Sequence, residues 1–174
     1  MPRARLVLLA LLAVALVWLG FRAVRAFDQD RHAAEAAAVL SASDVVTYRL
    51  PPVPDGRAAP SSPDAGGRFS YRPGTWLSVV ELDGLEPVAG DERYLVFLRN
   101  WAGWTLAGST SPRADGTAQV RSGAEPRPPT IYEVIVTRAV DDATSVPHGQ
   151  PVLQWFDASL APPKARRFDF ARGA

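Results

Sequence analysis

Short runs in which apolar and polar residues alternate recur from Val45 to Phe156, and links rich in glycine and proline separate them. A period of two places successive side chains on opposite faces of an extended strand. The links between the runs lack the 3.6-residue period of a helix. The runs are residues 45–50, 68–71, 76–82, 93–99, 104–109, 117–121, 131–138 and 151–156.

The regular spacing of these runs predicts an all-β fold, an antiparallel β-sandwich of about eight strands over residues 45–158. The alternate faces are too hydrophobic for a single sheet in water, so two sheets must bury them together. In the clearest strand we expect Val134 and Val136 on one face, with Glu133 and Ile135 on the other.

The links between strands carry turn and loop signals. Residues 51–67 are rich in proline, glycine and serine, which predicts a loop. Ala114-Asp115-Gly116 predicts a turn, because glycine takes a positive φ without strain. Residues 159–174 form a basic, proline-led tail. Phe168 and Phe170 dock this tail on the domain, or it stays disordered.

An apolar segment, Leu6–Leu19, follows two arginines near the N-terminus. It predicts that residues 1–27 are a membrane anchor or a signal segment. A helix from Leu6 to Phe27 would be about 33 Å long, which is enough to cross a bilayer. Cleavage before Phe27 is the alternative, and the charged Arg22 and Arg25 in that region argue against it.

Residues 28–44 contain many good helix formers behind acidic residues, which predicts a short helical stalk or linker. The arginines on the two sides of the apolar segment are nearly balanced. A very short N-terminal tail ahead of a large C-terminal domain favours the signal-anchor orientation. We therefore expect a single-pass protein of the cell membrane with residues 28–174 extracytoplasmic.

The distribution of charge narrows the class of partner. The net charge is +1, but all 18 acidic residues follow position 27, whereas four of the 19 basic residues precede it. The remainder is therefore slightly acidic and has no basic cluster outside the tail, which excludes nucleic acid as an expected partner. The chain has no cysteine, which excludes disulfides and thiolate zinc sites.

The sequence lacks the common enzyme signatures: it has no Gly-x-Ser-x-Gly, no Walker loop and no His-Glu-x-x-His. His32 lies in the predicted stalk and His148 in a predicted turn, and Asp141-Asp142 follows a strand. We interpret each as a solvated polar residue rather than a base or a metal ligand. The expectation is a protein that is not an enzyme, with no catalytic residue, no cofactor and no metal.

Trp101 and Trp104 are the candidate binding residues, because they lie on the two sides of a predicted hairpin in the stretch Asn100-Trp101-Ala102-Gly103-Trp104. Two indole rings in that position can stack on a sugar ring or on a partner's side chain. The alternative is structural, in which one tryptophan caps the core and the other shields the hairpin.

One short stretch predicts a sharp corner at the end of the sandwich. Gly84 lets the chain leave a strand, Leu85 plugs the end of the core and Pro87 stops further pairing. In their order and spacing, this corner and the later motifs resemble the C-terminal extracytoplasmic domain of the anti-sigma-K factor (RskA-like) family, over about residues 45–155. The later motifs are Tyr94 in YLVFLR, Ala107-Gly108, Asp115-Gly116-Thr117-Ala118, YEVIVT from Tyr132, and Pro147-x-Gly149-x-Pro151-Val152-Leu153.

The chain departs from the family pattern in several places. Phe97 stands where the family often has tryptophan, Arg138 where glutamate is common, and Asp141-Asp142 where a glycine pair is usual. Family members that hold a sigma factor do so with a cytoplasmic helical domain before the membrane segment. Only five residues precede Leu6 here, so we expect the outer domain without the sigma-binding domain.

The resemblance and the apolar segment together predict a non-catalytic, membrane-anchored, extracytoplasmic module for sensing or protein interaction in envelope signalling. The expected partners are the membrane, and a partner membrane protein or another component of an anti-sigma system. Any signal would pass through such a partner or through proteolysis near Asp28–Leu40. The alternative is a cell-envelope carbohydrate-binding or structural module that uses Trp101 and Trp104.

Overall fold

We describe a computed structural model of the chain, which places residues 18, 31, 33–53, 64–123, 130–140 and 144–168. The chain divides into two units, Met1–Ala37 and Ala38–Ala174. Residues 33–40 are helical, within the predicted stalk. The predicted membrane segment lies outside the described residues except for Trp18, and so do His32 and Asp141-Asp142.

Within the part of the chain that the structure describes, none of the helices has the length and apolar character needed to cross a membrane.

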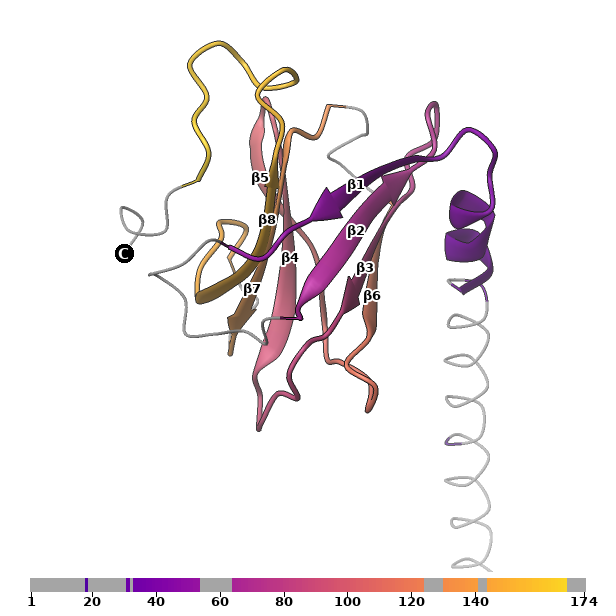
Figure 1. The fold of residues 1–174 in the computed structure, drawn as a ribbon, viewed down its shortest axis with the longest axis vertical. Helices are drawn as coiled ribbons and strands as arrows, with labels where there is room; N and C mark the ends of the chain where they lie inside the picture. Colours follow the sequence, from indigo (N-terminus) through magenta and orange to yellow (C-terminus); the bar gives the residue numbers. More distant parts are fainter. Residues whose placement is uncertain are drawn as a thin grey trace, which may run out of the picture. The chain divides into compact units, whose positions relative to one another are not determined.

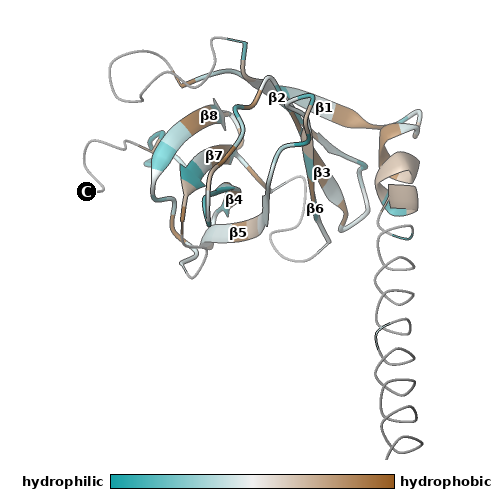
Figure 2. Ribbon diagram, turned by 90° about the horizontal axis from the view of Figure 1, so that it is seen from below, coloured by the Kyte–Doolittle hydropathy of each residue, from teal (hydrophilic) through white to brown (hydrophobic). Residues whose placement is uncertain are grey.

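In the residues of the second unit that the structure describes, eight strands form two antiparallel, four-stranded sheets, which confirms the predicted all-β fold with two sheets (Figure 1). One sheet has the order β1-β2-β3-β6 and the other has the order β5-β4-β7-β8. The two sheets form separate layers when they are viewed from below (Figure 2). The strands are β1 (Val46–Leu50), β2 (Gly66–Tyr71), β3 (Ser78–Asp83), β4 (Arg93–Asn100), β5 (Gly103–Thr110), β6 (Ala118–Ser122), β7 (Glu133–Ala139) and β8 (Gln150–Phe156).

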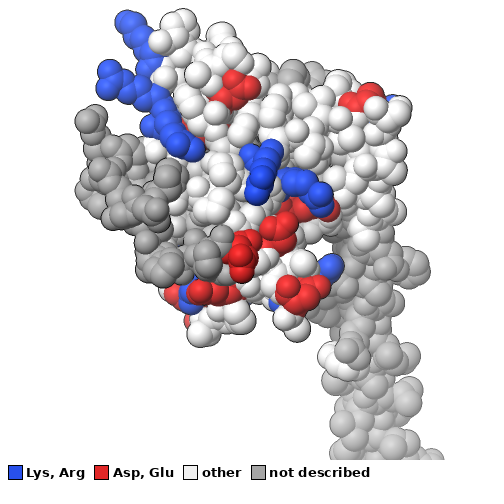
Figure 3. Space-filling view, viewed as in Figure 1, with Lys and Arg blue, Asp and Glu red and all other residues white. Residues whose placement is uncertain are grey.

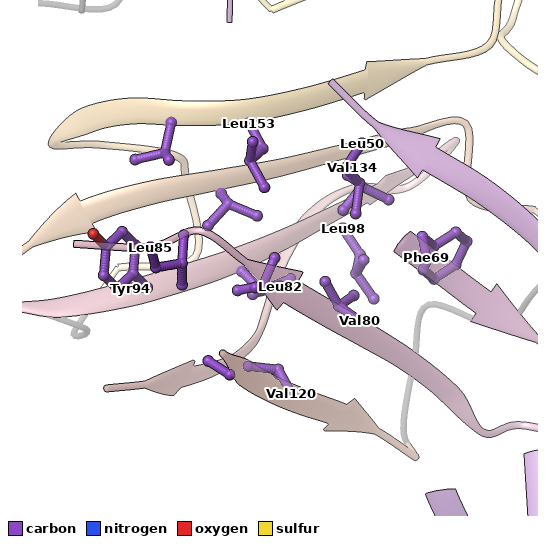
Figure 4. Packing of buried hydrophobic residues seen from close by; sticks show 14 of the residues in the cluster. Leu50, Phe69, Val80, Leu82, Leu85, Tyr94, Leu98, Val120, Val134 and Leu153 are labelled. Atoms are coloured by element: carbon purple, nitrogen blue, oxygen red, sulfur yellow. The ribbon is translucent and has the colours of Figure 1, made fainter. Parts of the chain in front are cut away.

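The main core lies between the two sheets and takes one face of each strand. Its side chains include those labelled in Figure 4, which point into the space between the layers. Burying each large aliphatic or aromatic side chain contributes about 1.5–3 kcal/mol relative to leaving it exposed. The labelled side chains are Leu50, Phe69, Val80, Leu82, Leu85, Tyr94, Leu98, Val120, Val134 and Leu153.

The predicted corner after β3 is present. Gly84 has a φ of 61°, and a Cβ at this position would lie 2.4 Å from the carbonyl oxygen of Asp64. Leu85 is buried in the core, and its N–H donates to the carbonyl of Gly116 at 3.0 Å. The Tyr94 hydroxyl donates to the carbonyl of Glu86 at 2.9 Å. The corner is therefore held by the backbone of Gly116 and by the Tyr94 side chain, and only glycine fits its first position.

The chain after β1 crosses to the edge of the other sheet. The N–H of Val53 donates to the carbonyl of Val152, and the N–H of Gln154 donates to the carbonyl of Pro51, both at 3.0 Å. Pro52 forms an isolated antiparallel bridge with Leu153. These bonds join the two sheets along the β1 and β8 edges and use backbone groups that would otherwise stay unpaired.

The predicted alternation in β7 is confirmed. Val134 and Val136 face the main core, whereas Glu133 and Ile135 point to the opposite face. Both of these outward residues are nevertheless fully buried. The outer face of this sheet is therefore covered at these positions.

Candidate functional site

The β4–β5 hairpin carries both predicted binding residues. Its turn consists of Trp101 and Ala102, and the side-chain oxygen of Asn100 accepts a hydrogen bond from the N–H of Ala102 at 2.9 Å. The Trp101 side chain is 70% exposed. Its indole N–H donates to the carbonyl of Leu160 at 2.9 Å. Trp101 thus presents an open ring face while its polar atom holds the C-terminal segment, defined here as residues 157–168.

Trp104 lies in a different environment from Trp101. It is partly buried and packs against the outer face of the β5-β4-β7-β8 sheet. Its ring meets the ring of Phe168 edge to face, with 5.4 Å between centroids. The guanidinium carbon of Arg99 lies 5.1 Å from the Trp104 ring centroid. The structure therefore brings each tryptophan to the C-terminal segment, but it does not form a matched pair of open rings.

A second, smaller apolar cluster covers this outer face, which we call the clamp face. Leu95, Phe97 and Ile135 are buried there, on strand positions that alternate with the main core. The His148 ring packs edge to face on Phe97 at 5.7 Å. Partly buried side chains complete the cover, and Phe168 of the C-terminal segment is one of them. A sheet face that would usually contact water is therefore covered by a loop and by the C-terminal segment.

A buried carboxylate lies at the centre of the clamp face. The Glu133 side chain is 0% exposed. Its Oε1 accepts hydrogen bonds from the Gln154 side chain at 2.7 Å and from the backbone N–H of Phe168 at 2.8 Å. Its Oε2 accepts from Arg99 Nη1 at 2.9 Å. A buried charge is tolerated only when its atoms are paired in this way.

Gln154 and Arg99 also bind the backbone of the C-terminal segment. Gln154 Nε2 donates to the carbonyl of Phe168 at 3.2 Å, and Arg99 Nη1 donates to the carbonyl of Arg166 at 3.1 Å. The clamp face therefore binds both the N–H and the carbonyl of Phe168. We call Arg99, Glu133 and Gln154 the tail clamp.

The register of the sheet positions the tail clamp. Arg99 on β4 pairs with Trp104 on β5 and with Glu133 on β7. Gln154 on β8 pairs with Ile135, two residues beyond Glu133. Directly opposed side chains on neighbouring strands lie close enough to interact. The three polar groups of the clamp therefore meet on one sheet face because of backbone pairing alone.

Electrostatic shifts around the tail clamp follow from burial and from hydrogen bonding. Burial raises the pKa of the Tyr132 hydroxyl, and the nearby charge of Arg99 opposes this rise. The hydroxyl of Ser159 donates to the carboxylate of Asp157 at 2.6 Å and lowers the pKa of that carboxyl group. Asp157 in its charged form thus fixes the turn from which the C-terminal segment begins.

His148 and Arg138 make local polar contacts away from the tail clamp. The Nδ1 atom of His148 lies 2.8 Å from the Thr144 hydroxyl and 3.0 Å from the carbonyl of Val146, inside its own loop. Arg138 pairs with Glu92 through its Nε at 3.0 Å. Among the described residues, no group of three or more histidines and acids is placed to hold a metal ion.

Sequence reasoning did not identify the tail clamp. The available signal was a polar residue inside an otherwise apolar strand, Glu133 in YEVIVT and Gln154 in PVLQWF. Such a residue on a covered face must have a partner, because an unpaired buried carboxylate costs several kcal/mol, on the order of 3–5. The partner of Glu133, the backbone of Phe168, is far away in the sequence. A local sequence pattern therefore does not reveal the site.

The opposite outer face, on the β1-β2-β3-β6 sheet, is different and is called here the charged face. Two shallow grooves share Arg68 and Asp83 along it. Basic and acidic side chains lie next to each other in the middle of the view in Figure 3. Asp115 beside one groove has a lowered pKa, because the Thr117 hydroxyl donates to it. The charged face therefore carries basic and acidic side chains in a mixed pattern, and they are not arranged around one ligand.

Comparisons with protein-family models, with curated proteins and with solved structures found no match to this chain.

Proposed function

We propose that the chain is a non-catalytic protein-interaction module that works through the clamp face. One observation carries this proposal: Glu133 and Gln154 bind the backbone N–H and the carbonyl of Phe168. Side chains that bind main-chain groups recognise an extended peptide regardless of most of its sequence, and an apolar pocket beside them adds selectivity for one side chain. The apolar side chain here is Phe168, which packs beside Trp104 in the cluster of the clamp face.

The arrangement of the tail clamp supports holding rather than reaction. Both oxygens of the Glu133 carboxylate already accept hydrogen bonds, and the carboxylate is closed off from water. A general base needs a free acceptor near a substrate proton, and this geometry does not offer one at Glu133. The same geometry suits a fixed anchor for a peptide.

The cellular setting that we propose rests on the sequence. The apolar segment Leu6–Leu19 supports a membrane anchor with the β domain outside the cytoplasm. The resemblance to the outer domain of anti-sigma-K factors supports a role in envelope signalling. Detergent fractionation tests the anchor, and a soluble product that begins at Phe27 would contradict it. A sigma-factor gene beside the gene of this protein would support the signalling role.

Site-directed photocrosslinking in cells tests the interaction function. A benzoylphenylalanine at Ala102, in the exposed hairpin turn, should give adducts with protein. The matched control places the same probe at Gln119, which is exposed on the charged face. We expect adducts from position 102 that weaken when Trp104 is changed to alanine. Equal adducts from both positions would contradict the proposal.

Carbohydrate binding is the second candidate, and the open ring of Trp101 is the observation that favours it. An exposed indole face is the usual platform for a sugar ring. In this case Trp101→Ala would abolish binding to cell-wall polysaccharide and leave the fold intact. Glycan adducts in place of protein adducts at position 102 would support this candidate over the first.

A further inference from the structure

The contacts of the C-terminal segment with the tail clamp depend little on its own sequence. The clamp donates to the carbonyls of Arg166 and Phe168 and accepts from the N–H of Phe168. The Phe168 ring fills the apolar surface beside Trp104. The side chains of Lys164, Arg166 and Arg167 are exposed, and basic side chains gather over this segment in Figure 3. Arg167 adds one long side-chain contact, in which its Nη2 donates to the carbonyl of Gln154 at 3.4 Å. The clamp face therefore recognises the segment chiefly by its backbone groups and by one aromatic ring.

The connection between the domain and the clamped residues is short and turned. Trp101 holds the carbonyl of Leu160, and a turn follows in which the N–H of Ala165 donates to the carbonyl of Pro162 at 2.8 Å. Pro163 and Lys164 in this turn are exposed. If this single turn bond opens, residues 161–165 can span up to about 17 Å when fully extended. With the turn open, the segment can still make the same hydrogen bonds and the same ring contact at the tail clamp.

We propose that the tail clamp also binds the C-terminal segment of a second copy of this chain, in exchange for its own. The occupant fits because it is the same segment with the same Phe168 and the same backbone groups. Two copies that exchange segments form a closed, two-fold pair in which each completes the other's clamp face. This inference rests on the proposed interaction function and names the partner of the clamp face.

Exchange competes with closure inside one chain. A tethered segment acts at an effective concentration on the order of millimolar, so the closed single chain dominates in dilute solution. Exchange becomes favourable when copies are concentrated or when the turn at 162–165 is open. The pair should therefore depend on concentration and should not need any new contact.

A complementation experiment on the full chain tests the exchange. One variant, Glu133→Gln, has a weakened clamp and an intact segment, and the other, Phe168→Ala, has an intact clamp and a weakened segment. Because the chain lacks cysteine, Gln119→Cys on the charged face gives a single labelling position for fluorescence energy transfer. The measurement is made in detergent. Each variant measured alone is the control for association through the N-terminal apolar segment.

The mixture should associate about tenfold more tightly than either variant alone, because only the mixture contains one good clamp and one good segment. A free peptide of residues 162–170 should compete, whereas the same peptide with Phe168→Ala should not. Gln154→Ala is a second clamp variant in case Glu133→Gln does not fold, and cooperative unfolding of each variant checks the fold.

Mixtures that associate no more tightly than the single variants would overturn the exchange, and so would equal competition by the two peptides. The crosslinking at position 102 separates this failure from that of the proposed function. Adducts with a protein of another mass would retain the interaction function and remove the second copy as its partner. Glycan adducts would remove both.

Discussion

The outer faces of the two sheets carry the same pair of residue types in the same geometry, but the two pairs have different surroundings. On the charged face, Arg68 pairs across strands with Glu81, with 3.5 Å between their charged atoms and side chains 61% and 29% exposed. On the clamp face, Arg99 pairs across strands with Glu133 at 2.9 Å, with side chains 24% and 0% exposed. The C-terminal segment covers only the second pair.

This comparison shows that burial, rather than cross-strand pairing, decides how much an ion pair contributes to the stability of the fold. An exposed pair contributes about 0–1 kcal/mol, because water solvates each charge nearly as well. Breaking a buried pair costs about 3–5 kcal/mol, because one charge is left without its partner. The difference between the faces should therefore appear when each glutamate is changed in the same way.

Glu133→Gln should give the largest effect. The substitution keeps the shape of the side chain, but it removes the charge that pairs with Arg99 and replaces one acceptor with a donor. We expect the free energy of unfolding to fall by about 2–4 kcal/mol, less than for a fully buried pair because Arg99 reaches water. Urea denaturation followed by circular dichroism measures it.

The matched control for this prediction is Glu81→Gln on the charged face, which should change the free energy of unfolding by less than about 0.5 kcal/mol. High salt should reduce the effect of Glu81→Gln and leave most of the effect of Glu133→Gln. Similar losses for the two variants would show that the clamp face is not closed, and the comparison would fail.

Phe168→Ala should give the next largest effect, because it removes the ring that packs on Trp104. We expect the C-terminal segment to open about tenfold more often, which corresponds to about 1.4 kcal/mol for an edge-to-face pair with its buried area. Limited trypsin digestion should then cut after Arg166 and Arg167 about tenfold faster. Cutting after Arg113, exposed near the charged face, is the internal control and should not change.

Gln154→Ala should have a smaller effect. It removes one of the donors to Glu133 and the donor to the carbonyl of Phe168, but Arg99 and the Phe168 N–H remain. The expected loss is about 0.5–1 kcal/mol, because Glu133 Oε1 still accepts from the Phe168 N–H. Gln119→Ala on the charged face should change stability by less than about 0.5 kcal/mol. A Gln154→Ala variant as stable as the parent would remove Gln154 from the clamp.

The strands were predictable from sequence because each depends on local alternation and on nearby turn residues. Gly84 and Asp115-Gly116 marked turns that the structure has. The burial of Glu133 was not predictable in the same way. It depends on Phe168, which lies 35 residues later in the sequence and meets Glu133 only through the tertiary fold.

The two tryptophans illustrate the same limit of sequence-based prediction. The hairpin was predicted from the sequence because its turn residues are local, but Trp101 lies in the turn itself and only Trp104 lies on a strand, β5. Their different environments were not predicted, because the C-terminal segment covers Trp104 and leaves most of Trp101 open. Whether they bind a partner or a sugar stays a prediction.

The smallest expected effect is a dependence on acidic pH, and it distinguishes two similar turns. Asp157, at the start of the C-terminal segment, and Asp115, near the charged face, each accept hydrogen bonds from the hydroxyl and the N–H of the residue two positions later. These bonds lower the pKa of both carboxyl groups. For a lowered pKa, the stabilisation is present above the ordinary aspartate range and is lost as the pH falls through the folded value.

Only the Asp157 turn leads directly to the clamp, because Leu160 follows it and accepts from the indole N–H of Trp101. The NMR signal of that indole N–H should therefore shift with the titration of Asp157 and should be insensitive to Asp115. Asp157→Asn should abolish the shift in the acid range, whereas Asp115→Asn should preserve it. An indole signal that follows Asp115 instead would mean that the two turns are coupled through the sandwich, and that the C-terminal segment is not a separately held element.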